Sequence, residues 1–346
     1  MKQQEIKKTR NYYFDILRIW ACIMVIINHT NSWVFGTYYP ELSGKLSLVL
    51  FFLCKTGVPI FFMISGALLL NKEESYKKVY GSRCLRIVFA LIFGSLLFVE
   101  NTEKSFFEDI VSGTYTTVYW YLYTYIGILL ILPFLRKMRR SFSENDYIFF
   151  VGINFIVTVL LPFMTYLEVI PSVSGYLSLP FFTGPILYLF LGDFLHHYGQ
   201  KLFIKISFLW KCIILIVCAA GSVIFSYMMT VQEYENSGHF VLALDNIYNM
   251  PIMICSASIF VLVQILFADL SIPMKLQKVI LEISSCTFGI YLIHMELIEQ
   301  TKELLSYLCI KINDWVAVLL NDILVFVLGL CIASILRRIP MLKKIL

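Results

Sequence analysis

The chain has 346 residues and a formal net charge of +5 at pH 7; 59% of its residues are hydrophobic and only 15% are charged. This composition excludes a soluble protein, because a chain of this size cannot bury so much apolar surface in its core. We expect no nucleic acid among its partners. Apolar segments of about 20 residues, the length of a membrane-crossing helix, recur along the whole chain. The sequence therefore predicts an all-α, polytopic membrane helical bundle.

The charges between the apolar segments predict the topology. We expect about ten transmembrane helices, at residues 13–35, 46–70, 83–99, 117–135, 147–169, 179–197, 206–229, 247–268, 285–308 and 315–336. Alternate connectors are rich in Lys and Arg, and two of the intervening ones, 100–116 and 231–246, are acidic. Since positive connectors mark the cytoplasmic side, both termini are predicted to be cytoplasmic. No connector looks able to fold alone, so residues 1–346 are expected to form a single transmembrane domain.

The first span carries ionisable residues within or beside its apolar run: Asp15, Arg18 and His29. An α-helix turns 100° per residue, so Arg18 and His29 project from one face, about 16 Å apart along the axis. Asp15 lies one turn before Arg18 and is predicted to pair with it. Arg18 alone also fits snorkelling toward the cytoplasmic interface, and His29 alone also fits a structural histidine. Ionisable groups inside a membrane nevertheless mark candidate functional sites, and these two share a face.

The second and third spans add three basic residues. Lys55 lies about as deep as His29 and needs a partner or a wet cavity. It precedes the Gly-Val-Pro step at residues 57–59, where we expect the helix to break beside a cavity. Arg83 and Arg86 stand one turn apart at the cytoplasmic start of the third span. They fit either ordinary topological anchors or a clamp for a phosphate or pyrophosphate.

Later spans contribute weaker candidates. Trp120 and Tyr121 open an aromatic run that fits an interfacial belt or a surface on which sugar rings stack. Glu168 closes the fifth span on the outer side, and His294 lies mid-membrane in the ninth. We predict that His196 and His197 are surface residues at a cytoplasmic helix end. The nine cysteines stand singly, so neither a metal site nor a disulfide framework is expected.

The pattern resembles the membrane acyltransferase-3 family, especially its surface-polysaccharide O-acyltransferases. The matching pieces follow in order along the chain: Arg18 and His29 within FDILRIWACIMVIINHT, then GVPIFFMISGALLL, Arg83-x-x-Arg86, WYLYTYIGILLILP and TFGIYLIH. The resemblance implies transfer of an acyl group, commonly acetyl from acetyl-CoA, to a sugar hydroxyl of a surface glycan or its lipid-linked precursor. It implies a multi-pass protein of a bacterial plasma membrane and carries functional roles over to Arg18, His29, Arg83 and Arg86.

The hypothesis from the sequence is an O-acyltransferase that takes acetyl-CoA, or another acyl-CoA, as donor substrate without a metal. Arg83, Arg86 and Arg18 would bind the donor, and His29 would act as general base or as a covalent acyl relay, helped by Asp15 and Lys55. Weak acceptor contacts are assigned to Trp120, Tyr121, Glu168 and His294. An alternative is a transporter of a small polar solute or glycan, which has less need of the arginine pair, and a third is a membrane sensor or scaffold. Homo-oligomerisation is left open.

Overall fold

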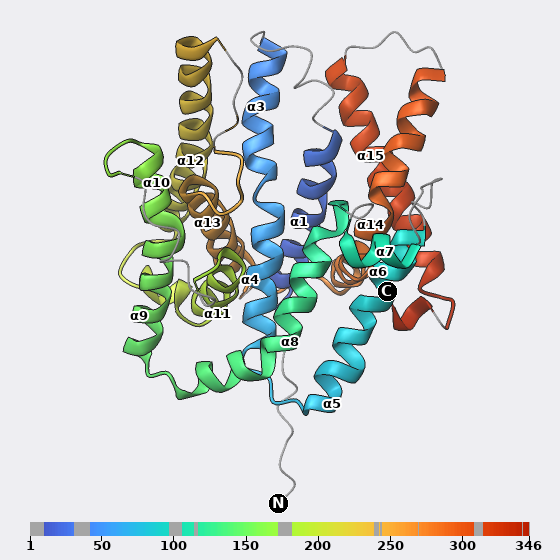
Figure 1. Ribbon diagram of the computed structural model, residues 1–346, viewed down its shortest axis with the longest axis horizontal. Coiled ribbons are helices and arrows are strands. Elements are labelled where there is room, and N and C mark those ends of the chain that lie inside the picture. Colours follow the sequence, from blue (N-terminus) through green and yellow to red (C-terminus); the bar gives the residue numbers. More distant parts are fainter. Residues whose placement is uncertain are drawn as a thin grey trace, which may run out of the picture.

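The computed structural model describes residues 10–30, 42–96, 106–113, 117–171, 182–238, 242, 244–268, 270–307, 314–340 and 342–345. Within these ranges the chain forms helices and turns and no strand (Figure 1). The elements are α1 (Tyr13–Thr30), α3 (Leu42–Cys54), α4 (Gly57–Leu69), α5 (Tyr76–Lys78), η1 (Val79–Cys84), α6 (Leu85–Leu96), α7 (Phe106–Ser112), η2 (Thr117–Tyr119), α8 (Trp120–Ser141), α9 (Glu144–Phe155), η3 (Ile156–Leu160), α10 (Leu161–Tyr166), α11 (Gly184–Leu202), α12 (Phe208–Ser237), α13 (Met250–Phe267), α14 (Met274–Tyr307), α15 (Asp314–Leu336) and η5 (Leu342–Lys344).

Nine helices in the described part of the chain are long and apolar enough to cross a membrane. The prediction of an all-α, multi-pass membrane protein is therefore confirmed. The sixth predicted span, 179–197, is the exception: its start lies outside the described residues, and α11 is not among the nine. Its polar residues, including a fully buried Asp193, lower its hydropathy. Because α11 packs against α4, α9 and α13, those residues find their partners in protein. The predicted connector 100–116 lies largely outside the described residues.

Helix α1 is the central helix of the bundle. It packs against α3, α4, α13, α14 and α15, and Figure 1 shows it between α3 and α4 on one side and α14 and α15 on the other. Buried residues occur on more than one side of it: Tyr13, Leu17, Ala21 and Ile26 are all at most 1% exposed. Because five helices pack around α1, several of its polar side chains also face other helices.

The second predicted span is broken in its middle, as the Gly-Val-Pro step predicted. Helix α3 ends at Cys54, a two-residue turn at Lys55 and Thr56 follows, and α4 begins at Gly57. Pro59 has no backbone N–H to donate to the Lys55 carbonyl, so the helical ladder fails there. A Cβ on Gly57 would lie 2.9 Å from the Ala21 carbonyl oxygen, which shows how closely α4 approaches α1.

Helices α4 and α11 pack backbone to backbone through two glycines. A Cβ on Gly66 would lie 1.7 Å from the Leu189 carbonyl oxygen, and a Cβ on Gly192 would lie 2.1 Å from that of Met63. Small residues at such crossings let membrane helices approach closely. The two glycines therefore permit the close crossing of α4 and α11.

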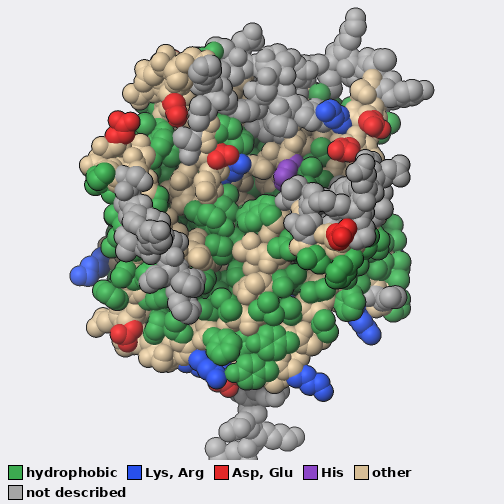
Figure 2. Space-filling view, viewed as in Figure 1, with side chains coloured by type: hydrophobic (Ala, Val, Ile, Leu, Met, Phe, Trp, Pro, Cys, Tyr) green, Lys and Arg blue, Asp and Glu red, His purple; other side chains and the backbone are tan. Residues whose placement is uncertain are grey.

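Two basic residues predicted at the surface are instead buried or partnered. Arg136 directly follows the predicted span 117–135 and so falls in a predicted connector, yet it is 3% exposed, because it lies against Leu69 and Glu74. His196, predicted at the surface, is only partly exposed: its Nδ1 shares a 2.5 Å hydrogen bond with the Tyr13 hydroxyl, and its ring packs on Phe14. His197 is exposed, as predicted. Figure 2 shows hydrophobic side chains across the middle of one face and most charged side chains near its upper and lower ends.

Candidate functional site

A buried carboxylate, that of Asp15, organises the N-terminal end of α1. Its side chain is 1% exposed. Arg10 donates to it through Nε (2.9 Å) and Nη2 (2.8 Å), Arg18 through Nη1 (2.9 Å), and Ser284 of α14 through Oγ (2.8 Å). The pairing of Asp15 with Arg18 that the helical spacing predicted is thus confirmed. It holds the Arg18 guanidinium in a fixed orientation and ties α1 to α14.

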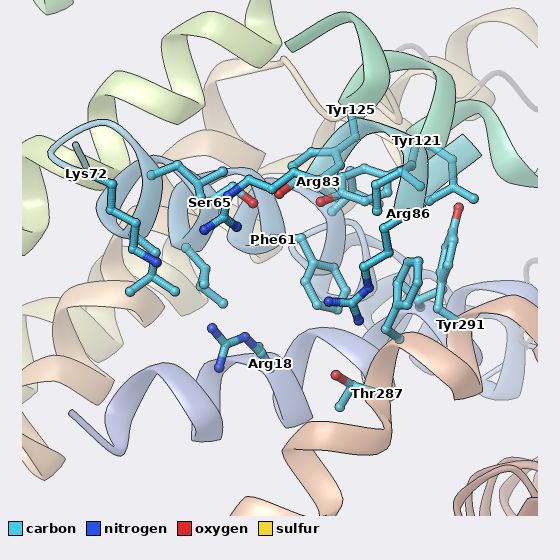
Figure 3. A pocket seen from close by; sticks show the side chains of 18 residues that line it. Arg18, Phe61, Ser65, Lys72, Arg83, Arg86, Tyr121, Tyr125, Thr287 and Tyr291 are labelled. Atoms are coloured by element: carbon cyan, nitrogen blue, oxygen red, sulfur yellow. The ribbon is translucent and has the colours of Figure 1, made fainter. Parts of the chain in front are cut away.

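A cavity of about 340 Å³ lies beside Arg18, between α1, α4, α6, α8 and α14. Four cationic side chains line it: Arg18, Lys72, Arg83 and Arg86. Figure 3 shows the three guanidinium groups and the Lys72 ammonium directed into the same space. Converging cations attract an anion of several charges, and the planar guanidinium fork matches a phosphate group.

The remaining wall of the cavity is mostly apolar and includes a cluster of aromatic rings. Tyr121 is its centre: its ring lies 6.1 Å from that of Phe61, 5.8 Å from that of Tyr125 and 5.9 Å from that of Tyr291, between centroids. Phe288 completes this wall. A site with cations on one side and aromatic rings on the other suits a ligand that has both a charged part and a less polar part.

Arg83 and Arg86, which stand one turn apart, both line the cavity, but their partners differ. Arg83 donates to both carboxylate oxygens of Glu74, through Nε (2.8 Å) and Nη2 (2.6 Å). Arg86 donates through Nε to the Ile345 backbone carbonyl (2.8 Å) and lies 5.6 Å from the Phe288 ring centroid. The hydrogen bonds from Arg83, opposed in part by burial, hold the pKa of Glu74 at about 2.

Lys72 also lines the cavity, although in the sequence it falls in a connector between two predicted spans. Burial lowers its pKa, and the positive charges of Arg83 and Arg136 lower it further. Because Lys72 follows the end of α4, helical periodicity cannot predict which residues it faces. Only the fold brings it to the arginines.

The polar faces of α1 and α14 run side by side in the same direction. Three contacts advance together along both helices: Asp15 with Ser284, the Cys22 thiol with the Thr287 carbonyl (3.8 Å), and His29 with His294. The wall of the cavity includes Arg18 and Val25 from α1 and Thr287 and Tyr291 from α14. The next turn of each helix carries a histidine, so the paired faces lead from the cations to His29 and His294.

The two histidines meet in the second half of α1. Their ring centroids are 5.2 Å apart, and the Tyr291 ring stacks on His294 at 5.5 Å. His294 is 1% exposed, and its Nδ1 lies 2.6 Å from the Tyr291 carbonyl oxygen. Because a carbonyl only accepts, Nδ1 carries the hydrogen and Nε2 of the neutral ring is an acceptor. Nε2 is buried without a hydrogen-bond partner among the described residues.

Lys55 lies at the break between α3 and α4, as predicted, and its environment is partly apolar. Its Nζ lies 4.2 Å from the Phe51 ring centroid, and it interacts electrostatically with His29. In Figure 2 this face of the molecule is hollowed near its upper centre, where a histidine and a basic side chain are visible. A cation beside an imidazole adds positive charge to that part of the site.

Two polar residues of α15, Asn321 and Asp322, lie next to this region and were not among the candidates predicted from the sequence. Asp322 is 8% exposed and accepts a hydrogen bond from the Thr30 hydroxyl, and its Oδ2 has no partner within the described residues. Asn321 accepts from the Thr301 hydroxyl at 2.5 Å. The Asn-Asp pair in the apolar run VAVLLNDILVFVLG was the available signal, since a carboxylate within a span marks a candidate site.

The four weak acceptor candidates do not gather at one place. His294 contacts His29, whereas Tyr121 lines the cavity with the arginines. Trp120 is 40% exposed and is not part of that wall. Glu168 is exposed in a left-handed turn (φ 57°) after α10, which lies at the left edge of Figure 1, far from α14 on the right. The structure thus brings His294 to His29 but not Glu168 or Trp120.

Apolar helices of membrane-crossing length around a cationic internal cavity define a multi-pass membrane protein. The family model described as an acyltransferase domain, that of the acyltransferase-3 family, matches residues 11–338. The chain belongs to this family and is a membrane acyltransferase, as the motifs indicated. No curated protein and no solved structure matches it.

Proposed function

We propose that this acyltransferase moves an acyl group, with acetyl as the first candidate, from acyl-CoA to a hydroxyl of a surface or lipid-linked glycan. We infer that it works in a bacterial plasma membrane with both termini cytoplasmic. In this orientation the Asp15 end of α1 faces the cytoplasm, where acyl-CoA is available, and His29 lies in the outer half of the membrane.

The cavity supports an acyl-CoA donor. Coenzyme A combines several phosphate charges with a long, less polar thioester arm, and the cavity combines four cations with an aromatic wall. In this proposal Arg18, Arg83 and Arg86 hold the phosphates at the inner end. The thioester arm follows the paired faces of α1 and α14 toward the two histidines.

One observation carries the proposal: α1 supplies both a cavity arginine and a partly buried histidine, on the same face. Arg18 and His29 are separated by about 16 Å along the axis, and that face packs on α14 between Ser284 and His294. A donor bound beside Arg18 therefore lies on the helix face that also carries a proton acceptor. A transporter needs no such pairing of phosphate-binding cations with an imidazole.

The chemistry assigned to the site is direct acyl transfer. His29 takes the proton of the acceptor hydroxyl as the oxygen attacks the thioester carbonyl carbon. The carbon–sulfur bond then breaks, CoA leaves as thiolate, and the imidazolium returns the proton to that sulfur. Lys55 would stabilise the negative charge that develops on the carbonyl oxygen. Asp15 contributes by holding Arg18.

CoA binding by the purified protein tests whether the cavity is the donor site. Replacing Arg86 by Ala removes one charge-assisted contact, worth about 1.5–3 kcal/mol, and should weaken CoA binding about 10- to 150-fold by isothermal titration calorimetry. Lys205→Ala, an exposed basic residue outside the cavity, is the matched control and should bind normally. Equal affinity of both variants and wild type would exclude the cavity as donor site.

A second experiment separates general base catalysis from an acyl-histidine relay. Wild type and His29→Gln are incubated with radiolabelled acetyl-CoA without acceptor and then denatured under mild conditions. Label retained by the wild type and lost with His29→Gln would identify a covalent relay. No retained label, together with acetyl transfer when acceptor is present, would identify the base mechanism.

A further inference from the structure

Glu74 lies at the centre of an unbalanced group of charges at the rim of the cavity. Its side chain is 7% exposed and contacts three cations: Arg83 at 2.6 Å, Arg136 at 2.9 Å and Lys78 at 3.6 Å. Lys72 interacts with the same group electrostatically. Four positive charges thus surround one carboxylate, and the cluster is short of negative charge.

The partners of Glu74 differ in how firmly they are held. Arg136 has a side chain 4% exposed, and its Nε donates to the Leu69 carbonyl at 2.8 Å. Its Nη1 is buried without a partner among the described residues. The Arg83 side chain is 29% exposed and lines the cavity, and it donates two hydrogen bonds to Glu74. Arg136 is therefore the fixed partner, and Arg83 is the partner that a ligand in the cavity can reach.

We propose that Glu74 is an exchangeable counter-ion that holds Arg83 until a phosphate group of the donor takes its place. The inference rests on the proposed function, since it needs a phosphate-bearing donor. A phosphate presents oxygens to the guanidinium fork as a carboxylate does, but with more charge. A buried carboxylate without any cationic partner would be destabilising. Glu74 avoids this, because its ion pairs with Arg136 and Lys78 remain when the pair with Arg83 is broken.

The exchange makes Glu74 a determinant of donor specificity. A ligand with a single negative charge gains little by displacing a carboxylate that already satisfies Arg83. A ligand with a doubly charged phosphate or a pyrophosphate compensates for the lost pair and also neutralises Lys72. The site thereby favours donors with several phosphate charges over simple carboxylates and over uncharged lipids.

The test compares CoA binding to wild type, Glu74→Gln and Glu73→Gln by calorimetry. Glu73 is the matched control, because its side chain is 84% exposed and pairs with Arg140 rather than Arg83. If Arg83 spends about nine-tenths of its time on Glu74, freeing it should lower the Kd of Glu74→Gln about tenfold. An unchanged or higher Kd in folded Glu74→Gln would overturn the proposal, because Glu74 would then only position Arg83.

If the wild type does not bind CoA, the proposed function is refuted but the exchange of Glu74 for a phosphate is not. The exchange is then tested by measuring the binding of inorganic pyrophosphate to the same three proteins. If Glu74→Gln does not fold, the structure of the wild type bound to CoA decides. Arg83 on a phosphate and more than 4 Å from Glu74 supports the exchange. An intact bidentate pair with phosphate bound elsewhere overturns it.

Discussion

Replacing Asp15 by Asn tests whether this carboxylate is the electrostatic support of Arg18. The substitution keeps the shape of the side chain but removes its charge. In the best amide orientation, Oδ1 still accepts from Arg10, Arg18 and Ser284, and the bond from Arg10 Nε to Oδ2 is lost because two donors face each other.

The expected cost follows from these bonds. The lost bond is worth about 1.5–3 kcal/mol as a charge-assisted contact, and the two bonds that remain with arginines weaken by about 1 kcal/mol each. The sum of about 3.5–5 kcal/mol lies within the usual cost of breaking a buried ion pair. We expect the melting temperature to fall by about 5 °C or more and CoA affinity to fall as well, because Arg18 loses its orientation.

Thermal unfolding of the detergent-solubilised proteins, followed by intrinsic fluorescence, measures the effect. Glu282→Gln is the matched control, since it neutralises a carboxylate on α14 that is 62% exposed and contacts Arg337 at 4.0 Å. It should melt within about 1 °C of wild type, because exposed ion pairs contribute little. If Asp15→Asn behaves like this control, Asp15 is not the support described above.

Three further outcomes are expected. Gly66→Leu should prevent correct packing of α4 on α11, because even a Cβ meets the Leu189 carbonyl; a monodisperse, wild-type-like elution profile in size-exclusion chromatography would contradict this packing. The pKa of Glu74 is lower in the folded state, so its ionised carboxylate stabilises the folded protein at pH values above the usual glutamate pKa. This stabilisation is lost as the pH falls from about 4.5 to about 2 and the carboxylate is protonated. The melting temperature of wild type should therefore decline more than that of Glu74→Gln between these pH values. Equal declines in the two proteins would refute this stabilising role of Glu74. Cysteines introduced at Glu235 and Lys137 should react with an impermeant reagent in intact cells only at Glu235, and the reverse pattern would overturn the topology.

The sequence was informative wherever a property depends on neighbours within one helix. The shared face of Arg18 and His29, the Asp15–Arg18 pair and the break before Gly57 all follow from helical geometry or from proline chemistry. For the same reason the arginine pair at 83 and 86 could be assigned to one surface before the fold was known.

The rest of the site depends on contacts between helices distant in the chain. Glu74 holds Arg83 and Arg136, which is 62 residues away, and His29 meets His294 across most of the chain. Helical periodicity carries no information on such contacts. Arg136 was misjudged because a basic residue near a span end usually anchors topology, whereas here it lies in a buried ion pair.

The central claim is that His29 performs the chemistry on an acyl group delivered from the cavity. It is tested most directly by measuring base-labile acetyl esters on the surface and lipid-linked glycans of cells that carry wild type, His29→Ala or His29→Gln at matched protein levels. CoA binding is measured on the same proteins. Wild type should acetylate the glycan, and both variants should lose at least about 100-fold in activity while binding CoA normally, because glutamine forms hydrogen bonds but cannot take up a proton. Substantial acetylation by His29→Gln would contradict the account.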